Sequence, residues 1–343
     1  MTGDALRADL VFEGGGVKGI GLAGAYAELY DRGWRAERVA GTSAGAITAA
    51  LVAAGYDGDR LRTTVLEDMD FRRFADGGLL GALGLLEHKG LHSGDYFLGW
   101  MRERLQETGI TRFGQLRADD DGAGDPSRRY RLQVIASDVS LSRMLVLPRD
   151  AALLGIDPDE LEIAYAVRMS MSIPVFYVPV VEHDHLIVDG GLLSNFPVWL
   201  FDVAAGEEPR WPTFGLLLVA PGQRHPLGEA PPSAGAAVQR LDFVQYLSAM
   251  AHTAMDAHDR LYVERADFAR TIPIPTGGVG TTQFDIAPAA ARALFAAGRA
   301  ATAEFLATWD FDAYRATFRT DLPVPSRRAA TVAAMHAPAA SSI

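Results

Sequence analysis

The sequence predicts an α/β protein in which helices cover a mostly parallel sheet. The first 56 residues contain two strand–turn–helix units, and a glycine-rich turn joins the strand to the helix in each. Neighbouring parallel strands need a crossover connection, which is usually a helix, so consecutive units of this kind indicate a parallel sheet. A later run of apolar residues at 214–219 has the length and composition of another buried strand.

The elements follow one another in a regular order along the chain. The first unit has an apolar strand at 10–12 and a helix over 17–31, and the second has a strand at 37–40 and a helix that ends at Ala54. A glycine follows each helix and terminates it, and residues 57–118 are expected to be mostly helical. The later expected elements are strands at 130–136, 144–147, 176–181 and 186–188 and long helices at 238–265 and 288–309.

No internal repeat and no clear linker divides the chain. We therefore expect one domain over 1–320, with its core motifs in 9–200 and further strands and helices in 201–320. The residues from 321 to 343 are rich in Pro, Ala and Ser and are expected to form a flexible tail.

Composition excludes several classes of function. The 43 acidic residues outnumber the 32 basic ones, and a net charge of −11 argues against binding to nucleic acid. The absence of cysteine excludes a disulfide framework, thiolate metal sites and a cysteine nucleophile. The first residues have neither a basic nor an apolar signal region, and the uncharged stretch 39–56 opens with turn-forming residues. We therefore expect a cytoplasmic protein without a membrane span.

A Gly-x-Ser-x-Gly motif lies between the second strand and its helix. Gly41 and Gly45 flank Ser43 in the strand–turn–helix context of a nucleophile elbow. Such a turn leaves no room for side chains at the glycines and presents the serine at a helix N-terminus, which favours developing negative charge. The motif indicates a nucleophilic serine, and the alternative is an ordinary glycine-rich packing turn.

A glycine loop follows the first strand in a similar position. Backbone N–H groups of Gly14, Gly15 and Gly16 can point at an oxyanion or a phosphate. With Gly19 the loop also satisfies Gly-x-Gly-x-x-Gly, so a dinucleotide site is an alternative. A dinucleotide site requires an acidic residue at the end of the second strand, whereas Glu37 lies at the start of that strand. In the same loop, Lys18 is either a surface residue or a support for the glycines.

The candidate base is an aspartate rather than a histidine. The histidines that a Ser–Asp–His order would use lie in no recognisable strand-end loop; they are His225, His252, His258 and His336. The segment 183–185 resembles a hairpin turn, and the alternative is a metal or catalytic role. Asp189 ends an apolar strand and precedes Gly190 and Gly191, where a carboxylate serves either in a site or as the cap of a turn.

Taken together, these motifs resemble those of the patatin-like phospholipase family. The glycine loop at 14–19, the Gly-x-Ser-x-Gly at 41–45 and the Asp-Gly-Gly at 189–191 stand in the family's order, and the similarity covers about 9–200. Further matches are Ala136-Ser137-Asp138, Ser172-Ile173-Pro174 with Phe176 and Pro179, Asn195-Phe196-Pro197 and, as in bacterial members, Thr282-Gln283-Phe284-Asp285.

The resemblance implies a three-layer α/β/α fold related to the α/β hydrolases and a catalytic dyad without histidine. Ser43 then corresponds to the nucleophile and Asp189 to the general base. The amides of Gly15 and Gly16, with Gly14 setting the turn, correspond to the oxyanion hole. The glycines and lysine that support these motifs are Lys18, Gly19, Gly41, Gly45, Gly190 and Gly191.

The expected function is that of a serine hydrolase that cleaves carboxylic esters of phospholipids, lysophospholipids or related lipids through an acyl-enzyme. The same dyad also suits an acyltransferase, and a nucleotide-binding protein is the alternative from a different class. No cofactor and no metal is expected, and an acidic run at 119–125 lacks the register of a calcium loop. The expected partner is a lipid or other acyl ester, with at most transient contact at a membrane surface.

Three features bear on the pocket rather than on the dyad. The apolar, glycine-rich segment 77–86 is either a lid that meets lipid or a buried covering of the sheet. Met169 and Met171 stand where the family usually has small residues, and they either pack in the core or line an acyl tunnel. Val175 stands where the family often has glycine.

Overall fold

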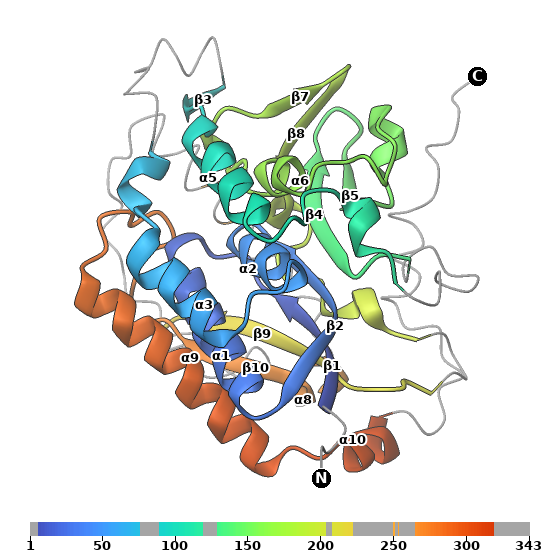
Figure 1. The fold of residues 1–343 in the computed structure, drawn as a ribbon, viewed down its shortest axis with the longest axis vertical. Helices are drawn as coiled ribbons and strands as arrows, with labels where there is room; N and C mark the ends of the chain where they lie inside the picture. Colours follow the sequence, from blue (N-terminus) through green and yellow to red (C-terminus); the bar gives the residue numbers. More distant parts are fainter. Residues whose placement is uncertain are drawn as a thin grey trace.

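The computed structural model describes residues 6–75, 89–118, 129–203, 208–221 and 265–318, together with 250 and 253 (Figure 1). Its centre is an eight-stranded sheet with the strand order β10-β9-β1-β2-β4-β8-β7, in which β5 also pairs with β4. The parallel strands are β1 (Leu6–Phe12), β2 (Trp34–Thr42), β4 (Leu132–Asp138), β9 (Thr213–Val219) and β10 (Thr271–Pro275). The antiparallel strands are β5 (Arg143–Leu147), β7 (Val180–Glu182) and β8 (His185–Asp189).

Longer helices cover one face of this sheet. Helix α2 packs on β2, α6 on β4 and α9 on β10, while α1 and α9 run side by side (Figure 1). Their bounds are α1 (Ile20–Asp31), α2 (Ala44–Ala53), α6 (Ile163–Ser170) and α9 (Pro288–Thr308). The other face is covered by the short helices η7 (Gly190–Leu192) and η8 (Val198–Phe201). The protein therefore has the mostly parallel sheet and the three-layer α/β/α arrangement that the sequence predicted.

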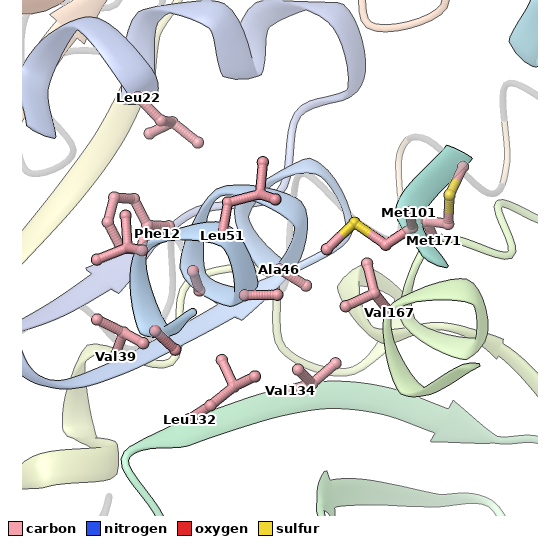
Figure 2. Packing of buried hydrophobic residues seen from close by; sticks show 14 of the residues in the cluster. Phe12, Leu22, Val39, Ala46, Leu51, Met101, Leu132, Val134, Val167 and Met171 are labelled. Carbon is pink, nitrogen blue, oxygen red and sulfur yellow. The ribbon is translucent and has the colours of Figure 1, made fainter. Parts of the chain in front are cut away.

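Strand alternation divides the core between these two faces. Phe12 joins the larger cluster under the long helices, whereas its neighbour Val11 joins the smaller cluster on the opposite face. This alternation is the two-residue period of a strand that is buried on both sides. Figure 2 shows the larger cluster, where Leu51 of α2 lies over the sheet and Met171 approaches from the end of α6. Met169 and Met171 are both buried in this cluster, which favours core packing over a tunnel lining.

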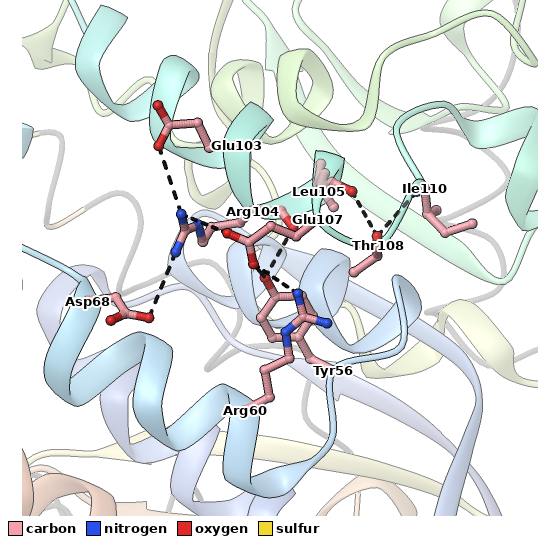
Figure 3. Close-up of polar contacts among 9 residues, drawn as sticks. All are labelled: Tyr56, Arg60, Asp68, Glu103, Arg104, Leu105, Glu107, Thr108 and Ile110. Carbon is pink, nitrogen blue, oxygen red and sulfur yellow. Dashed lines mark hydrogen bonds and ion pairs between the residues drawn. The ribbon is translucent and has the colours of Figure 1, made fainter.

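Two further helices, which pack against α1 and α6, are joined by polar contacts at the surface. Helices α3 (Gly58–Thr63) and α5 (Asp95–Gln106) meet near Glu107, which pairs with Arg60 at 2.9 Å and with Arg104 at 2.7 Å (Figure 3). The hydroxyl of Tyr56 donates to the Arg104 carbonyl at 3.1 Å. Exposed ion pairs of this kind stabilise a fold by about 1 kcal/mol or less each. They therefore contribute more to the relative orientation of the two helices than to the free energy of folding.

Most predicted elements are present, with informative differences. The strand expected at 176–181 is two strands, β6 (Val175–Tyr177) and β7, because Pro179 between them has no N–H to donate. Strands β3 (Gly90–His92) and β10 and helix α10 (Phe311–Phe318) were not predicted. Most of the helix expected at 238–265, the segment 77–86, the acidic run 119–125 and the tail 321–343 lie outside the described residues.

Candidate active site

Two strands that point toward each other build the candidate site. Strands β2 and β8 both lie along the same edge of β4, and they run in opposite directions. Thr42 at the end of β2 pairs with Ile135, and Asp189 at the end of β8 pairs with Ala136, the next residue of β4. Successive residues of a strand rise by about 3.3 Å, so the carboxyl ends of the two strands almost touch. Ser43 and Asp189 are brought together in this way.

Ser43 occupies a strained turn at the start of α2. Its backbone has φ 52° and ψ −122°, a region that residues with a side chain rarely adopt. The turn is crowded, since a Cβ on Gly45 would lie 2.2 Å from the Phe12 carbonyl oxygen. The Ser43 N–H donates to the hydroxyl of Ser170 at 2.9 Å, which fixes the turn against α6. The serine is 2% exposed and lies at a helix N-terminus, as the motif predicted.

Asp189 is fully buried beside this serine. Its Oδ1 accepts the Gly191 N–H at 2.8 Å, and its own N–H donates to the Ser172 carbonyl at 2.9 Å. Its Oδ2 receives no well-formed hydrogen bond from the described groups. Burial raises the pKa of Asp189 to about 7, although the nearby Ser43 hydroxyl and the Gly191 N–H both act to lower it. A carboxyl group with this pKa can exchange a proton with a hydroxyl near neutral pH.

The glycine loop follows β1 and lies next to the elbow. The Gly14 N–H donates to the Asn195 carbonyl at 3.0 Å, and a Cβ on Gly14 would lie 2.2 Å from Asn195 Oδ1. Gly16 has φ +56°, and a Cβ there would lie 2.0 Å from the Thr281 carbonyl oxygen. The N–H groups of Gly15 and Gly16 donate to no protein acceptor within the described part of the chain. Two backbone donors are therefore available for a ligand oxygen, and Gly14 shapes the turn.

Three residues around these motifs were not predicted to belong to the site. Glu13 accepts the Leu218 N–H of β9 at 2.5 Å through Oε2, and its Oε1 accepts from Asn195 Nδ2 at 3.4 Å. Asn195 Nδ2 also donates to the Gly14 carbonyl at 3.1 Å. These two side chains therefore fix the glycine loop between β9 and the segment that follows Asp189. Asn195 belongs to the Asn195-Phe196-Pro197 match to the family, which could have marked it, whereas Ser170 lies in a helix with no local motif.

The supporting residues of the motifs take packing positions. A Cβ on Gly19 would lie 3.0 Å from the Ala44 side chain, which explains how closely the loop helix approaches α2. A Cβ on Gly190 would lie 2.2 Å from the Ile135 carbonyl oxygen of β4. Lys18 is half-buried, and its Cε would lie 3.6 Å from a Cβ on Gly15, so its stem borders the loop. These contacts favour a supporting position for Lys18 over a simple surface one.

The residues that the alternatives would use either lie outside the described residues or make other contacts. His225, His252, His258 and His336 lie outside them. The segment 183–185 forms the turn of the β7–β8 hairpin, and there His185 Nδ1 lies 2.7 Å from Asp138 Oδ2. Glu37 pairs with Arg7 at 2.9 Å, far along β2 from its carboxyl end. No cluster of potential metal ligands occurs among the residues that the structure describes.

Comparison with known proteins identifies the family. The sequence profile of the patatin-like phospholipases matches residues 10–202, which include the glycine loop, the elbow and the Asp-Gly-Gly motif. The chain belongs to this family. This patatin-like protein is 36% identical to YqhO of Bacillus subtilis over 314 residues, which are 88% of this chain and 99% of that one. It is 29% identical to the NTE family protein Rv2565 of Mycobacterium tuberculosis over 193 residues, which are 55% of this chain and 27% of that protein.

The fold comparison agrees with the sequence comparison. The crystal structure of VipD from Legionella pneumophila superposes with a TM-score of 0.51 at 19% identity, and the match covers 89% of this chain and 67% of that one. Membership in the patatin-like family supports a lipid ester hydrolase activity in general terms. Within the described residues, no helix is both long enough and apolar enough to cross a membrane.

Proposed function

We propose that this patatin-like protein is a serine hydrolase that cleaves carboxylic ester bonds of phospholipids, lysophospholipids or related lipids. One observation carries the proposal: opposing strand ends bring a strained serine next to a buried aspartate whose pKa is about 7. Serine is a weak nucleophile on its own, and it needs an adjacent base. In this proposal Asp189 is that base, and the two free amides of the glycine loop are the oxyanion donors.

In the acylation step, Asp189 accepts the hydroxyl proton while Ser43 Oγ attacks the ester carbonyl carbon. The carbonyl oxygen becomes an oxyanion, and the N–H groups of Gly15 and Gly16 stabilise it. Removing one such donor typically slows an enzyme by about 100- to 1,000-fold. When the intermediate collapses, the ester C–O bond breaks, and the leaving alcohol takes the proton from Asp189. An acyl-Ser43 ester remains.

Deacylation repeats these roles with water as the nucleophile. Asp189 takes a proton from the water as its oxygen attacks the acyl carbon, and Gly15 and Gly16 again stabilise the oxyanion. Collapse releases the fatty acid, and the proton returns to Ser43 Oγ. An acceptor alcohol in place of water would make the same protein an acyltransferase, which the products of the reaction distinguish.

Covalent labelling with a fluorophosphonate probe tests the dyad directly. We expect the probe to modify Ser43, as mapped by mass spectrometry, and we expect no labelling in Ser43→Ala and strongly reduced labelling in Asp189→Asn. Ser140→Ala and Asp184→Asn are the matched controls, because they change the same residue types at exposed positions, and they should label normally.

The outcome separates the proposal from its alternatives. Unchanged labelling in Asp189→Asn, with a circular dichroism spectrum that matches the parent protein, would contradict the proposed dyad. A protein that fails to label but retains a nucleotide on purification would favour the glycine loop as a nucleotide site.

A further inference from the structure

A cavity of about 940 Å³ lies at the end of the sheet opposite to Ser43. Its walls include Asp9 in the middle of β1, Arg38 in the middle of β2, and Arg131 and Trp211, which stand just before β4 and β9. The cavity therefore lies beside the amino ends of β4 and β9, whereas the candidate active site is at the carboxyl ends of β2 and β8. We propose that this cavity binds a small organic anion that carries a phosphate or carboxylate group on a ring or short apolar body.

The charge of the lining differs from that of the protein as a whole. Five arginines line the cavity against three carboxylates, in a chain whose net charge is −11; the arginines are Arg7, Arg38, Arg117, Arg131 and Arg210. Of the carboxylates, Asp9 and Glu37 pair with Arg38 and Arg7, and Glu208 pairs with Arg315, which does not line the cavity. Arg117 in turn pairs with Asp159, which does not line the cavity, so the excess positive charge of the lining comes from Arg131 and Arg210. This excess favours an anionic ligand.

Two of the arginines have no carboxylate partner in the described part of the chain. Arg131 donates only to the backbone carbonyls of Glu37, at 3.1 Å, and Ala36, at 3.3 Å. Arg210 lies over the ring of Trp211, with its guanidinium carbon 5.4 Å from the ring centre. A guanidinium group offers five N–H donors, so both side chains retain donors for a ligand. Their planar forks match phosphate and carboxylate oxygens.

A buried ion pair and aromatic rings form part of the cavity wall. Asp9 is 1% exposed and accepts two hydrogen bonds from the Arg38 guanidinium, at 3.0 and 2.5 Å. That guanidinium lies 4.8 Å from the centre of the Phe201 ring. This buried ion pair forms a fixed part of the wall, and Trp211, which lies beneath the Arg210 guanidinium, adds aromatic surface. Ligand sites combine apolar walls with a few fixed polar groups in a volume of about 300–1,000 Å³.

Isothermal titration calorimetry tests the proposal with three probes: adenosine monophosphate, citrate and inorganic phosphate. We expect at least one of them to bind with a dissociation constant below about 1 mM. A preference for adenosine monophosphate over inorganic phosphate would indicate a phosphorylated ligand with a ring, and a preference for citrate would indicate a polycarboxylate. Binding should persist in Ser43→Ala, because the cavity is separate from the proposed active site.

Single arginine substitutions locate the binding. Arg131→Gln and Arg210→Gln should each raise the dissociation constant of the preferred probe about tenfold, because each removes one charge-assisted contact. Arg62→Gln is the matched control, because Arg62 is an exposed arginine on α3 that pairs with Glu67 and does not line the cavity. All variants should keep the melting temperature of the parent protein. No measurable binding of any probe, or equal losses in all three arginine variants, would overturn the proposal.

Discussion

Full burial of Asp189 gives this carboxyl group a protonation equilibrium near neutral pH, far from that of an ordinary aspartate. Only the ionised form can accept the Ser43 proton. The raised pKa therefore places the pH at which this form appears within the physiological range. The same shift makes Asp189 a stronger base once it is ionised, which matches a base to its task. The proposed dyad therefore does not require a histidine.

Activity is expected to rise with pH through about 7. With an Asp189 pKa of about 7, the ionised fraction falls about tenfold for each pH unit below that value, and it changes little above pH 8. The measurement is kcat/KM for a soluble short-chain p-nitrophenyl ester between pH 5 and 8. A profile that is flat across this range, or that falls with rising pH, would contradict Asp189 as the base.

Val175 is a second residue at which the backbone conformation affects the stability of the protein. It has φ 72°, and a β-branched side chain is rarely tolerated in this left-handed region. This explains why the resemblance to the family points to glycine at this position. Strain of this kind costs about 1–3 kcal/mol, while glycine loses about 0.5–1 kcal/mol through the entropy of the unfolded chain.

Val175→Gly is therefore expected to stabilise the protein by about 1 kcal/mol, with little change in labelling at Ser43. Thermal and chemical unfolding measure the difference. Val181→Gly in β7 is the control, because that valine has an ordinary strand conformation, and it should destabilise the protein. A lower stability for Val175→Gly would show that side-chain packing outweighs strain.

At the level of elements, the glycine loop depends on the segment that follows Asp189. Asn195 contacts Gly14 through its backbone carbonyl and through Nδ2, and Glu13 ties the same side chain to β9. The proposed oxyanion donors, Gly15 and Gly16, are thus positioned by groups that the proposed mechanism does not use directly. An error of about 1 Å in such positions can cost about 100-fold in rate.

Asn195→Ala is expected to lower kcat by about tenfold or more while KM stays nearly constant, because the oxyanion donors act in the transition state. Glu13→Gln keeps an acceptor on the loop and should lose less. Gln106→Ala, at the end of α5, serves as a control for loss of a surface amide. A change in KM alone would assign Asn195 to substrate binding instead of to positioning of the loop.

Elements with strong local patterns could be predicted from the sequence, and elements defined by pairing could not. Apolar runs revealed β1, β4 and β9, and the helix expected at 288–309 matches α9 almost to its ends. Strand β10 was missed because Pro273 and Pro275 argue against a strand, yet prolines are tolerated on the edge strand that β10 forms.

The candidate site shows the same division. The motifs around Ser43 and Asp189 are local, and the sequence places each residue at a strand end. The sequence could not predict that β2 and β8 meet end to end along β4, since that depends on pairing between distant segments. Ser170 was missed for the same reason, because its contact with the Ser43 N–H joins α6 to the elbow across the fold.

The net charge of the whole molecule affects how it meets a lipid surface. A charge of −11 repels bilayers that contain anionic lipids, and this repulsion is long-ranged only when salt is low. Docking should therefore depend on the composition of the membrane and on ionic strength, independently of the chemistry at Ser43.

Hydrolysis of phosphatidylcholine vesicles is expected to slow when about a third of the lipid is replaced by phosphatidylglycerol at low salt. Salt at about 0.15 M should largely restore the rate, since the Debye length is then about 8 Å. Fatty acid release measures both effects, and the soluble ester reports any direct effect of salt on the site. Faster hydrolysis of the anionic vesicles at low salt would reveal a local basic docking surface.

The end-to-end meeting of β2 and β8 also means that a growing chain completes the proposed dyad late in translation. The proposed nucleophile and the glycine loop are synthesised early, but the proposed base, Asp189, arrives only with β8, far later in the chain. Until that strand takes its place along β4, the emerging polypeptide has a serine without a base. Under the proposed mechanism, lipid hydrolysis therefore begins only once β8 has paired with β4.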